Sequence, residues 1–267
     1  MGMILEIRDG AFSYGEADIF QNIHLSLNRG DFLCLLGPNG CGKTTLLKCL
    51  GSMLQLKQGS ILLNGQSLES IPPKQRAADI GYVPQEEGVA FPFSVHQMVS
   101  IGRSPYVGYF SAPTENDYEI VEASLKRVGI YHLKDKVFNK MSGGEKQLTL
   151  IARALAQQPK VMLMDEPTSH LDYGNQNRIM QLARELTKEG MAVLMSTHTP
   201  DAVFTYATKA ALMYHGSLIA KGLPQDALTQ DNLSLAYSMP MKIFKLTDEN
   251  GNVQTFCRAD NFNQGGK

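Results

Sequence analysis

The chain has 267 residues, of which 43% are hydrophobic and 19% charged, and its mean hydropathy is -0.17. This composition is typical of a water-soluble globular protein with one large α/β domain, and it excludes collagenous, disordered and membrane-embedded chains. The 25 basic and 26 acidic side chains leave a net charge of -1, so there is no global positive field to hold nucleic acid.

The first 40 residues predict strands. Residues 4–7 and 19–27 have strand patterns. Residues 32–36 form a continuous apolar run that ends at Gly37, as a buried central strand would. The amino-terminal part is therefore expected to combine antiparallel hairpins with one strand–loop–helix unit.

A helix is predicted to follow this strand. From Thr44 the leucines recur on one helical face, at Leu47, Leu50 and Leu54. Further on, apolar residues 61–63 lead into Asn64 and Gly65. These two residues tolerate a positive φ, so they favour a hairpin turn.

The middle of the chain changes character. Residues 86–140 predict a mostly helical insertion, with one helix face formed by Tyr118, Val121, Leu125 and Val128. The elements expected next are a helix carrying Leu148, Ile151 and Leu155, a strand at 160–164, a helix carrying Ile179, Leu182 and Leu186, and a strand at 192–196. Such alternation predicts a parallel sheet with helices on its faces.

Near its end the chain carries a second hairpin signal. Residues 242–246 and 253–257 flank the turn sequence 248–251, and a loose polar tail is expected at 260–267. No internal repeat is found in the sequence.

Apolar runs and cysteines exclude two further classes. Runs of about five residues are far shorter than the roughly 20 that span a bilayer, and residues 1–10 do not have the pattern of a secretory signal. The cysteines lack close pairs and accompanying histidines, which disfavours zinc and a disulfide framework. They are Cys34, Cys41, Cys49 and Cys257. We expect a reducing cytoplasmic setting.

A glycine-rich loop separates strand 32–36 from the helix after it. It matches the phosphate-loop pattern G-x-x-x-x-G-K-[S/T] with Gly37, Pro38, Asn39, Gly40, Cys41, Gly42, Lys43 and Thr44. Its glycines let main-chain N–H groups converge on phosphate oxygens, and the helix start adds its positive dipole end. We expect Lys43 to reach the β and γ phosphates and Thr44 to bind Mg²⁺, and we assign Thr45 to the nucleotide as well.

Two acids follow a second apolar strand. Apolar residues 161–164 are followed directly by Asp165 and Glu166. The carboxyl ends of the strands in a parallel sheet border the crevice in which ligands bind. Asp165 is expected to hold Mg²⁺ through water, and Glu166 to take a proton from an attacking water. Taken alone, the segment also fits a solvated acidic turn before Pro167.

A second anion nest decides the family. Its residues are Ser142, Gly143, Gly144, Glu145, Lys146 and Gln147. A hydroxyl and two glycines at a helix start can hold a phosphate. The segment resembles the signature loop of ATP-binding cassette (ABC) ATPases and lies upstream of the two acids, as in that family. The resemblance implies two ATP molecules held between two head-to-tail copies of the chain.

The resemblance also implies a fold. It is an α/β phosphate-loop NTPase core with a mostly parallel sheet, an N-terminal antiparallel β subdomain and an inserted helical subdomain. The expected boundaries are 1–85 and 159–240 for the core with its β subdomain, 86–158 for the helical signature subdomain, and 241–267 for the hairpin and tail.

Four further residues match the family. Tyr14 resembles the residue that stacks on adenine, and Gln85 the glutamine that touches Mg²⁺ and the attacking water. Asp172 lies in a loop similar to the one that communicates across the dimer, and His198 resembles the switch histidine at the γ phosphate. Each would be unremarkable alone; the series carries the assignment.

Three residues depart from the pattern or modify it. Met141 replaces the usual leucine, a nearly neutral apolar exchange, and Glu145 replaces the usual glutamine. Glu145 adds an anion near a phosphate site, which we expect Lys146 to offset and which would weaken ATP-driven closure. Cys41 precedes a helix start, which is expected to lower the pKa of its thiol.

Two segments indicate an importer. Residues 100–106 with Gly108, Tyr109 and Phe110 resemble the G-R-x-P-x-x-G stretch of ATPases that serve iron-siderophore, haem and cobalamin importers, and residues 227–233 resemble an element after their core. The resemblance implies an ATPase at the cytoplasmic face of the membrane, coupling ATP-driven dimer closure to uptake of a metal chelate. Its partners would be a second copy, membrane permease subunits and, indirectly, a substrate-binding protein.

Two other functions fit part of the sequence. A cytosolic ABC-type ATPase could act as a regulatory switch without transport, although this single cassette has no long coiled coil and no basic excess. Another phosphate-loop enzyme, such as a kinase, would leave the Ser142 loop unexplained. The cargo cannot be read from this chain, since the ATPase subunit does not touch it.

Overall fold

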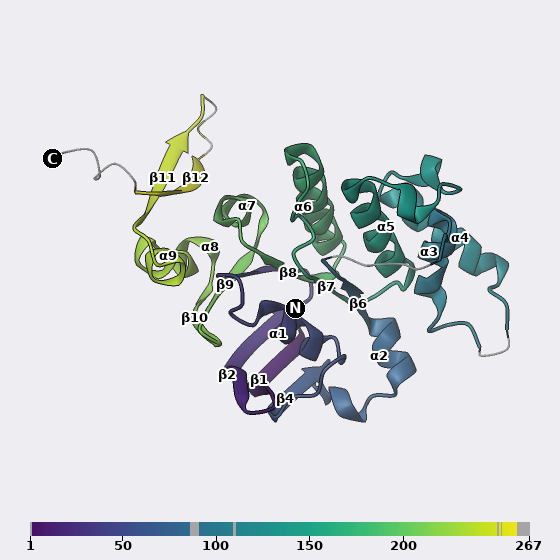
Figure 1. The fold of residues 1–267 in the computed structure, drawn as a ribbon, viewed down its shortest axis with the longest axis horizontal. Helices are drawn as coiled ribbons and strands as arrows, with labels where there is room; N and C mark the ends of the chain where they lie inside the picture. Colours follow the sequence, from purple (N-terminus) through teal and green to yellow (C-terminus); the bar gives the residue numbers. More distant parts are fainter. Residues whose placement is uncertain (1, 86–90, 109–110, 250, 252, 261–267) are drawn as a thin grey trace.

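A six-stranded sheet organises the part of the chain that this computed structural model describes, which is residues 2–85, 91–108, 111–249, 251 and 253–260 (Figure 1). The strands are β3 (Phe32–Leu36), β6 (Ile80–Val83), β7 (Val161–Met164), β8 (Ala192–Thr197), β9 (Lys209–Tyr214) and β10 (Ser217–Gly222). Their order is β10-β9-β3-β8-β7-β6, and all neighbours are parallel except β9 and β10. This confirms the predicted mostly parallel sheet.

The sheet is buried on both faces. Along β3, Phe32, Cys34 and Leu36 belong to one hydrophobic cluster, whereas Leu33 and Leu35 belong to the other. Successive side chains of a strand point to opposite faces, so a strand covered on both sides needs apolar residues at every position. This explains the continuous apolar run.

An antiparallel sheet covers one face, with α1 (Lys43–Leu50) contributing to the core between the sheets. Its strands, in the order β2-β1-β4-β5, are β1 (Met3–Tyr14), β2 (Ala17–Asn28), β4 (Gln58–Leu63) and β5 (Gln66–Ser67). The predicted turn between β4 and β5 is confirmed, because Asn64 and Gly65 have φ values of 50° and 80°.

One predicted helical position was wrong. The helix after the phosphate loop ends at Leu50, and Gly51 caps it. Ser52 then adopts a φ of 60°, which turns the chain out of the helical path. Leu54 is therefore half-buried in the irregular segment beyond the helix and does not extend its face.

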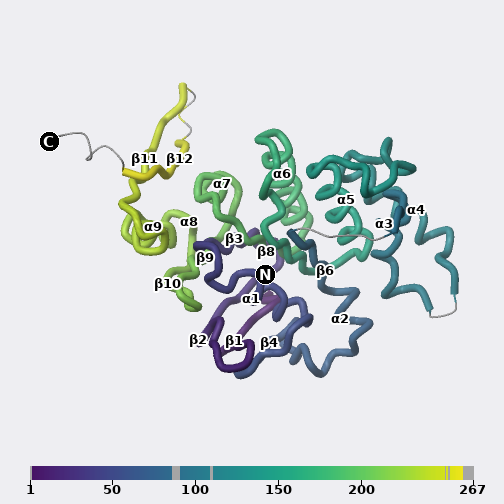
Figure 2. The backbone as a smooth tube through the Cα atoms, viewed as in Figure 1, coloured from purple at the N-terminus to yellow at the C-terminus, as the bar shows by residue number. Residues whose placement is uncertain are grey.

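Helices cover the other face and extend from one side. They are α3 (Val95–Ser100), α4 (Glu115–Arg127), α5 (Gly143–Ala156), α6 (Tyr173–Lys188), α7 (Pro200–Tyr206), α8 (Pro224–Ala227) and α9 (Gln230–Tyr237), with short 3-10 turns η2 (Ile101–Arg103), η3 (Tyr131–Leu133) and η4 (Phe138–Lys140). The short turn η1 (Leu68–Ser70) and helix α2 (Pro73–Asp79) lie instead on the side of the antiparallel sheet (Figure 1). α3, α4 and α5 pack together at one end of the molecule (Figure 2). Ser94, Thr114 and Ser142 begin these helices with capping boxes.

The carboxyl-terminal hairpin lies at the opposite end (Figure 1). It pairs β11 (Met241–Thr247) with β12 (Val253–Ala259), as predicted. Tyr109 and Phe110 of the importer-like stretch, Asn250 of the second turn and tail residues 261–267 lie outside the described residues. Among the described residues, no helix has the length and apolar composition of a membrane span. The four cysteines are buried free thiols.

The importer-like stretch contains a buried ion pair. Arg103, only 4% exposed, donates from Nε to Oδ1 of Asp117 (2.8 Å) and from a terminal nitrogen to the Ala156 carbonyl (2.7 Å). Its guanidinium also lies over the Tyr106 ring, 3.9 Å from the centroid. This stretch therefore ties the start of α4 to the end of α5.

Asp117 makes the stability of this region pH-dependent. Hydrogen bonds from the Thr114 hydroxyl and N–H, and then from Arg103, lower the pKa of Asp117 to about 2. Ionised Asp117 therefore stabilises the fold above its unfolded pKa of about 4, and this contribution is lost as the pH falls toward 2. Urea unfolding of Asp117→Asn should show a stability deficit at pH 7 that shrinks steadily below pH 4.

An exposed acid of the same helix supplies the control. The free energy of unfolding of Glu119→Gln should differ from that of wild type by much less at pH 7, and this difference should not shrink below pH 4. A deficit of Asp117→Asn that stays constant from pH 7 to the acid limit would contradict the assignment.

Candidate functional site

A cavity of about 880 Å³ lies at the carboxyl ends of the central parallel strands. Predicted site residues that line it are Gly37, Pro38, Asn39, Gly40, Gly42, Lys43, Thr44, Thr45, Gln85, Glu166 and His198. Ile19, Ser169, His170 and Tyr237 complete the wall. The loops after β3, β7 and β8 thus meet in one place, which we call the site cavity.

The phosphate loop leaves β3 through a conformation that needs glycine. Gly37 has a φ of 152°, and a Cβ there would lie only 2.2 Å from the Met213 carbonyl oxygen. Gly42 precedes α1 with a φ of 107°. Larger residues would push the loop away from the sheet, so these glycines keep its main chain at the cavity wall.

Lys43 is held inside its own loop. The side chain is 5% exposed, and its Nζ donates to the carbonyls of Gly37 (2.8 Å) and Pro38 (3.1 Å). Its Nζ also lies 3.4 Å from Oε1 of Glu166. A buried ammonium group needs such partners, and they place its charge beside the cavity.

Asp165 is the centre of a buried hydrogen-bond network. Its Oδ1 accepts from the Thr44 hydroxyl (3.0 Å) and the Ser196 hydroxyl (2.9 Å), and its Oδ2 accepts from the Tyr82 hydroxyl (3.3 Å). Burial, and then the neighbouring Asp165, raise the pKa of Tyr82, so this phenol stays a donor. The network thus joins the phosphate loop, β6, β7 and β8.

Glu166 is held in an unusual backbone conformation. Its φ is 43°, in the left-handed region, and its N–H donates to the Ser196 hydroxyl (2.8 Å). Its Oε2 accepts from Ser169 (3.1 Å) and lies 3.6 Å from Nδ1 of His198. Such strain persists only where the surroundings impose it, and here it directs the carboxylate into the cavity.

The serine-glycine loop (residues 142–144) lies outside this cavity, as do the adenine candidate and Asp172. Ser142 and Gly143 are exposed at the start of α5. Asp172 begins α6 by accepting from the Asn175 N–H (2.9 Å). Gly144 faces Asn175 so closely that a Cβ there would lie 2.7 Å from its amide nitrogen. The loop and the start of α6 therefore share one surface.

Glu145 has a structural role at this loop. Its carboxylate accepts from the Ser142 N–H (2.9 Å) and from Nζ of Lys136 (2.9 Å), and these bonds, the one from Lys136 first, lower its pKa. Lys136, and not the expected Lys146, is therefore the observed ion-pair partner of this carboxylate. The Ser142 hydroxyl accepts from the Glu145 N–H (3.3 Å), which leaves its own hydrogen available to a ligand.

Cys41 differs from the expectation, whereas Tyr14 is placed on the surface. Burial raises the pKa of the Cys41 thiol and outweighs the effect of nearby Lys43, so the expected decrease was wrong. Tyr14 is 55% exposed, and its ring packs edge-on against Phe12 with centroids 4.8 Å apart.

Several residues of the site have roles that the sequence did not predict. Ser196 forms hydrogen bonds with both acids. The sequence feature that could have indicated it is a hydroxyl near the end of the buried strand β8, which pairs with β7. Gln147, expected only as part of the second anion nest, is buried on α5 and donates to the Pro84 carbonyl (3.3 Å) beside Gln85. Tyr237 comes from α9, far along the chain, and no local motif indicates it.

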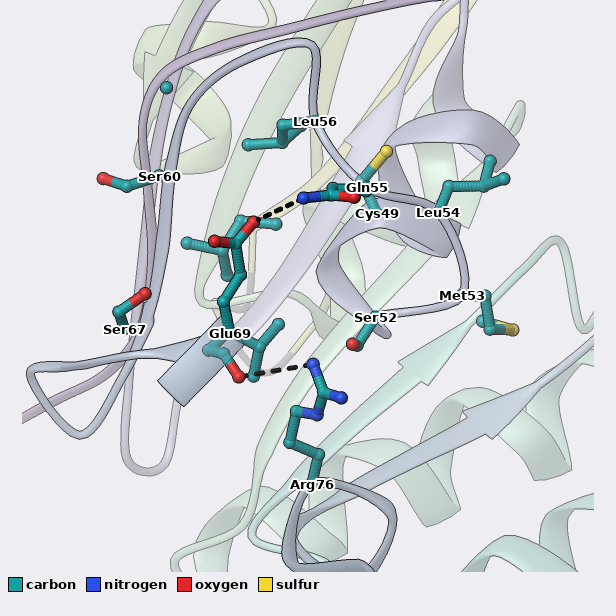
Figure 3. A pocket seen from close by; sticks show the side chains of 13 residues that line it. Cys49, Ser52, Met53, Leu54, Gln55, Leu56, Ser60, Ser67, Glu69 and Arg76 are labelled. Carbon is teal, nitrogen blue, oxygen red and sulfur yellow. Dashed lines mark hydrogen bonds between the residues drawn. The ribbon is translucent and has the colours of Figure 1, made fainter. Parts of the chain in front are cut away.

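A separate cavity of about 450 Å³ lies in the β subdomain (Figure 3). Its lining residues lie between positions 49 and 76 and include no residue of the predicted site. Gln55 donates to Glu69 (3.1 Å) across it, and Arg76 donates to the Leu68 carbonyl (3.4 Å). Neither of the two acids lines this second cavity.

Comparison with known proteins places this geometry in a family. A family model described as ABC transporter matches residues 20–169. A molybdate import ATP-binding protein of Haemophilus influenzae is 35% identical over 243 residues, which is 90% of each chain. An iron(3+)-hydroxamate import ATP-binding protein of Bacillus subtilis is 31% identical over 231 residues, 86% of each chain.

A solved structure agrees with these relatives. Its description assigns it to the metal-chelate type of ABC transporter, and it superposes with a TM-score of 0.86 at 33% identity, covering 97% of this chain and 98% of its own. The predicted fold and ATPase activity are thereby confirmed. With its phosphate loop and paired acids meeting in one cavity, the chain belongs to the family of ABC transporter ATP-binding proteins, which bind and hydrolyse ATP.

Proposed function

We propose that this chain is the ATPase subunit of an ABC importer and acts as a head-to-tail dimer. The observation that carries the proposal is the position of the serine-glycine loop. This second phosphate nest is exposed at a helix start and lies outside the site cavity of its own chain. A second copy could place its loop over the cavity, so that each ATP is held from both sides.

ATP would then act as the bridge of a two-state clamp. A ligand shifts an equilibrium only by its differential affinity for the two states. ATP contacts Lys43 of one copy and Ser142 of the other in the closed dimer alone, so its binding favours closure. Hydrolysis removes the bridge, and the dimer opens.

The residues present fit Mg²⁺ together with the nucleotide. The Thr44 hydroxyl, the Asp165 carboxylate and the Gln85 amide offer the oxygen ligands that Mg²⁺ prefers. Mg²⁺ would neutralise charge on the phosphates when bound. Glu166 would accept a proton from the attacking water, His198 would contact the γ phosphate, and Tyr14 would stack on adenine from outside the cavity described.

The movement that accompanies dimer closure would reach a membrane permease through the helical residues 86–158. Gln85 lines the site cavity, and the neighbouring Pro84 carbonyl accepts from Gln147 of α5. A shift of Gln85 toward bound nucleotide would therefore be transmitted to the residues 86–158, which we propose to act as one subdomain. This reading places the chain at the cytoplasmic face of the membrane.

The proposed cargo is a metal chelate of the iron-siderophore, haem or cobalamin type. The importer-like stretch at 100–106 supports it, as does the iron(3+)-hydroxamate relative. The molybdate relative defines the competing cargo class. Uptake of radiolabelled ferric siderophore and of molybdate, in cells carrying and lacking the gene, would distinguish the two.

Removing the proposed base should separate binding from turnover. Glu166→Gln is expected to lower the ATPase rate by about 10²- to 10⁴-fold, the usual contribution of a general base, while ATP affinity stays within a few-fold of wild type. Steady-state ATPase assays and nucleotide titrations measure the two effects. Glu69→Gln, in the separate cavity, is the matched control and should retain full turnover.

Removing the loop lysine should act on binding itself. Lys43→Ala is expected to weaken ATP affinity at least about tenfold, because hydrogen bonds to charged groups are worth about 1.5–3 kcal/mol. Equilibrium titration with a fluorescent ATP analogue measures this loss, and exposed Lys74→Ala should leave the affinity unchanged. Undiminished affinity in Lys43→Ala would place the triphosphate elsewhere.

Copurification tests transport against a regulatory role. The tagged chain, expressed with the products of its neighbouring genes, is expected to bring down a polytopic permease, and its ATPase rate should rise with a loaded binding protein. Recovery with soluble partners only, with no such stimulation, would favour the cytosolic switch.

A further inference from the structure

Helix α9 lies in the carboxyl-terminal part of the chain (Figure 1). It carries a tyrosine that lines the site cavity. Tyr237 ends this helix, and it lines both the site cavity and an adjoining cavity of about 550 Å³. Asn39 and Gly40 of the phosphate loop also line both cavities. Ser238 has a φ of 52°, so the chain turns sharply after Tyr237. The end of α9 therefore faces the phosphate loop.

The Tyr237 hydroxyl is buried without a protein partner. Its oxygen has less than 1 Å² exposed, and no group among the described residues hydrogen-bonds to it. Two carboxylates have such an oxygen as well, but both form ion pairs, Glu6 with Arg8 and Asp260 with Lys242. Buried polar atoms are nearly always paired, because leaving one unpaired costs stability. The unpaired hydroxyl at this place points to a ligand.

The hydroxyl is also kept in its donor form. Burial, and then the nearby Cys257, Cys41 and Glu166, raise the pKa of Tyr237 to about 12. The phenol therefore carries its proton throughout the neutral range and can donate to an anion.

Strands β11 and β12 fix the position of α9. The Met241 N–H donates to the Ser234 hydroxyl (2.9 Å), and the Ile243 N–H donates to Oε1 of Gln230 (3.0 Å). On the other strand of the hairpin, the Cys257 N–H donates to Oδ1 of Asp201 on α7 (2.7 Å). Strands β11 and β12 thus brace α9 against the core, which gives them a positioning role.

We propose that Tyr237 is an additional nucleotide ligand, whose hydroxyl donates a hydrogen bond to the phosphate chain of ATP. The phosphates are the favoured part of the nucleotide because the site cavity that Tyr237 lines is also lined by the phosphate loop, Glu166 and His198. The inference rests on ATP binding by this cavity and does not depend on import, cargo or dimer formation.

The test is the conservative variant Tyr237→Phe, which keeps the ring and removes the hydroxyl. Its affinity for ATP should fall about tenfold, as expected for one hydrogen bond to a charged group. Titration with a fluorescent ATP analogue, competed with unlabelled ATP, measures the loss. Tyr206→Phe is the matched control, because the Tyr206 hydroxyl bonds to Asn177 (2.9 Å) outside the site cavity, and its ATP affinity should equal that of wild type.

Thermal unfolding separates a ligand contact from a structural one. Without nucleotide, Tyr237→Phe should melt no lower than wild type, because it loses no internal hydrogen bond, and the rise in Tm with added ATP should be smaller. A lower Tm without nucleotide would mean that the hydroxyl has a structural partner, and would overturn the proposal.

Analogues identify the part of the nucleotide that is contacted. The affinity loss should be the same for ATP and for 2′-deoxy-ATP and 3′-deoxy-ATP. A loss that disappears with either deoxy analogue would assign the contact to the ribose and overturn the proposal, as would unchanged ATP affinity in Tyr237→Phe. Lys43→Ala, measured in parallel, shows whether ATP occupies this cavity, so failure of the Tyr237 contact is distinguishable from failure of the site.

Discussion

Parallel pairing of β3, β8 and β7 is the constraint on which the site depends. Parallel strands end at the same edge of a sheet, so the loops that follow them must meet there. The phosphate loop follows β3, His198 follows β8, and the two acids follow β7. A change that breaks this strand pairing would move Lys43, the two acids and His198 away from one another.

The groups at this edge are arranged by buried polar contacts and not by apolar packing alone. The Ser196 hydroxyl accepts from the Glu166 main-chain N–H and donates to the Asp165 carboxylate, and the Thr44 hydroxyl connects Asp165 to the phosphate loop. In a low-dielectric interior such bonds are strong, and losing one leaves its partner unsatisfied. The network therefore fixes the two carboxylates in different environments: Asp165 is buried, whereas Glu166 faces the cavity.

The two phosphate nests differ in their surroundings. The phosphate loop lines a cavity built by its own chain, with Lys43 held by the loop carbonyls. The serine-glycine loop is open to solvent, and Lys136 with Glu145 stabilises its helix start without covering it. The phosphate loop thus has its partners within the chain, whereas the serine-glycine loop exposes Ser142 and Gly143 to solvent. This difference is the physical basis for expecting a second copy of the chain.

Local patterns were enough to predict the central strands, the hairpin at Asn64 and Gly65, and the phosphate loop, because burial on both faces and positive φ leave direct marks in the sequence. The family and its ATPase activity also followed from short motifs. Only the tertiary structure decided which groups touch: Ser196 bridging the acids, Lys136 pairing with Glu145, and Tyr237 reaching the cavity from more than 190 residues beyond Lys43. It also reversed the expected pKa change of Cys41, because burial depends on neighbours that are distant in sequence.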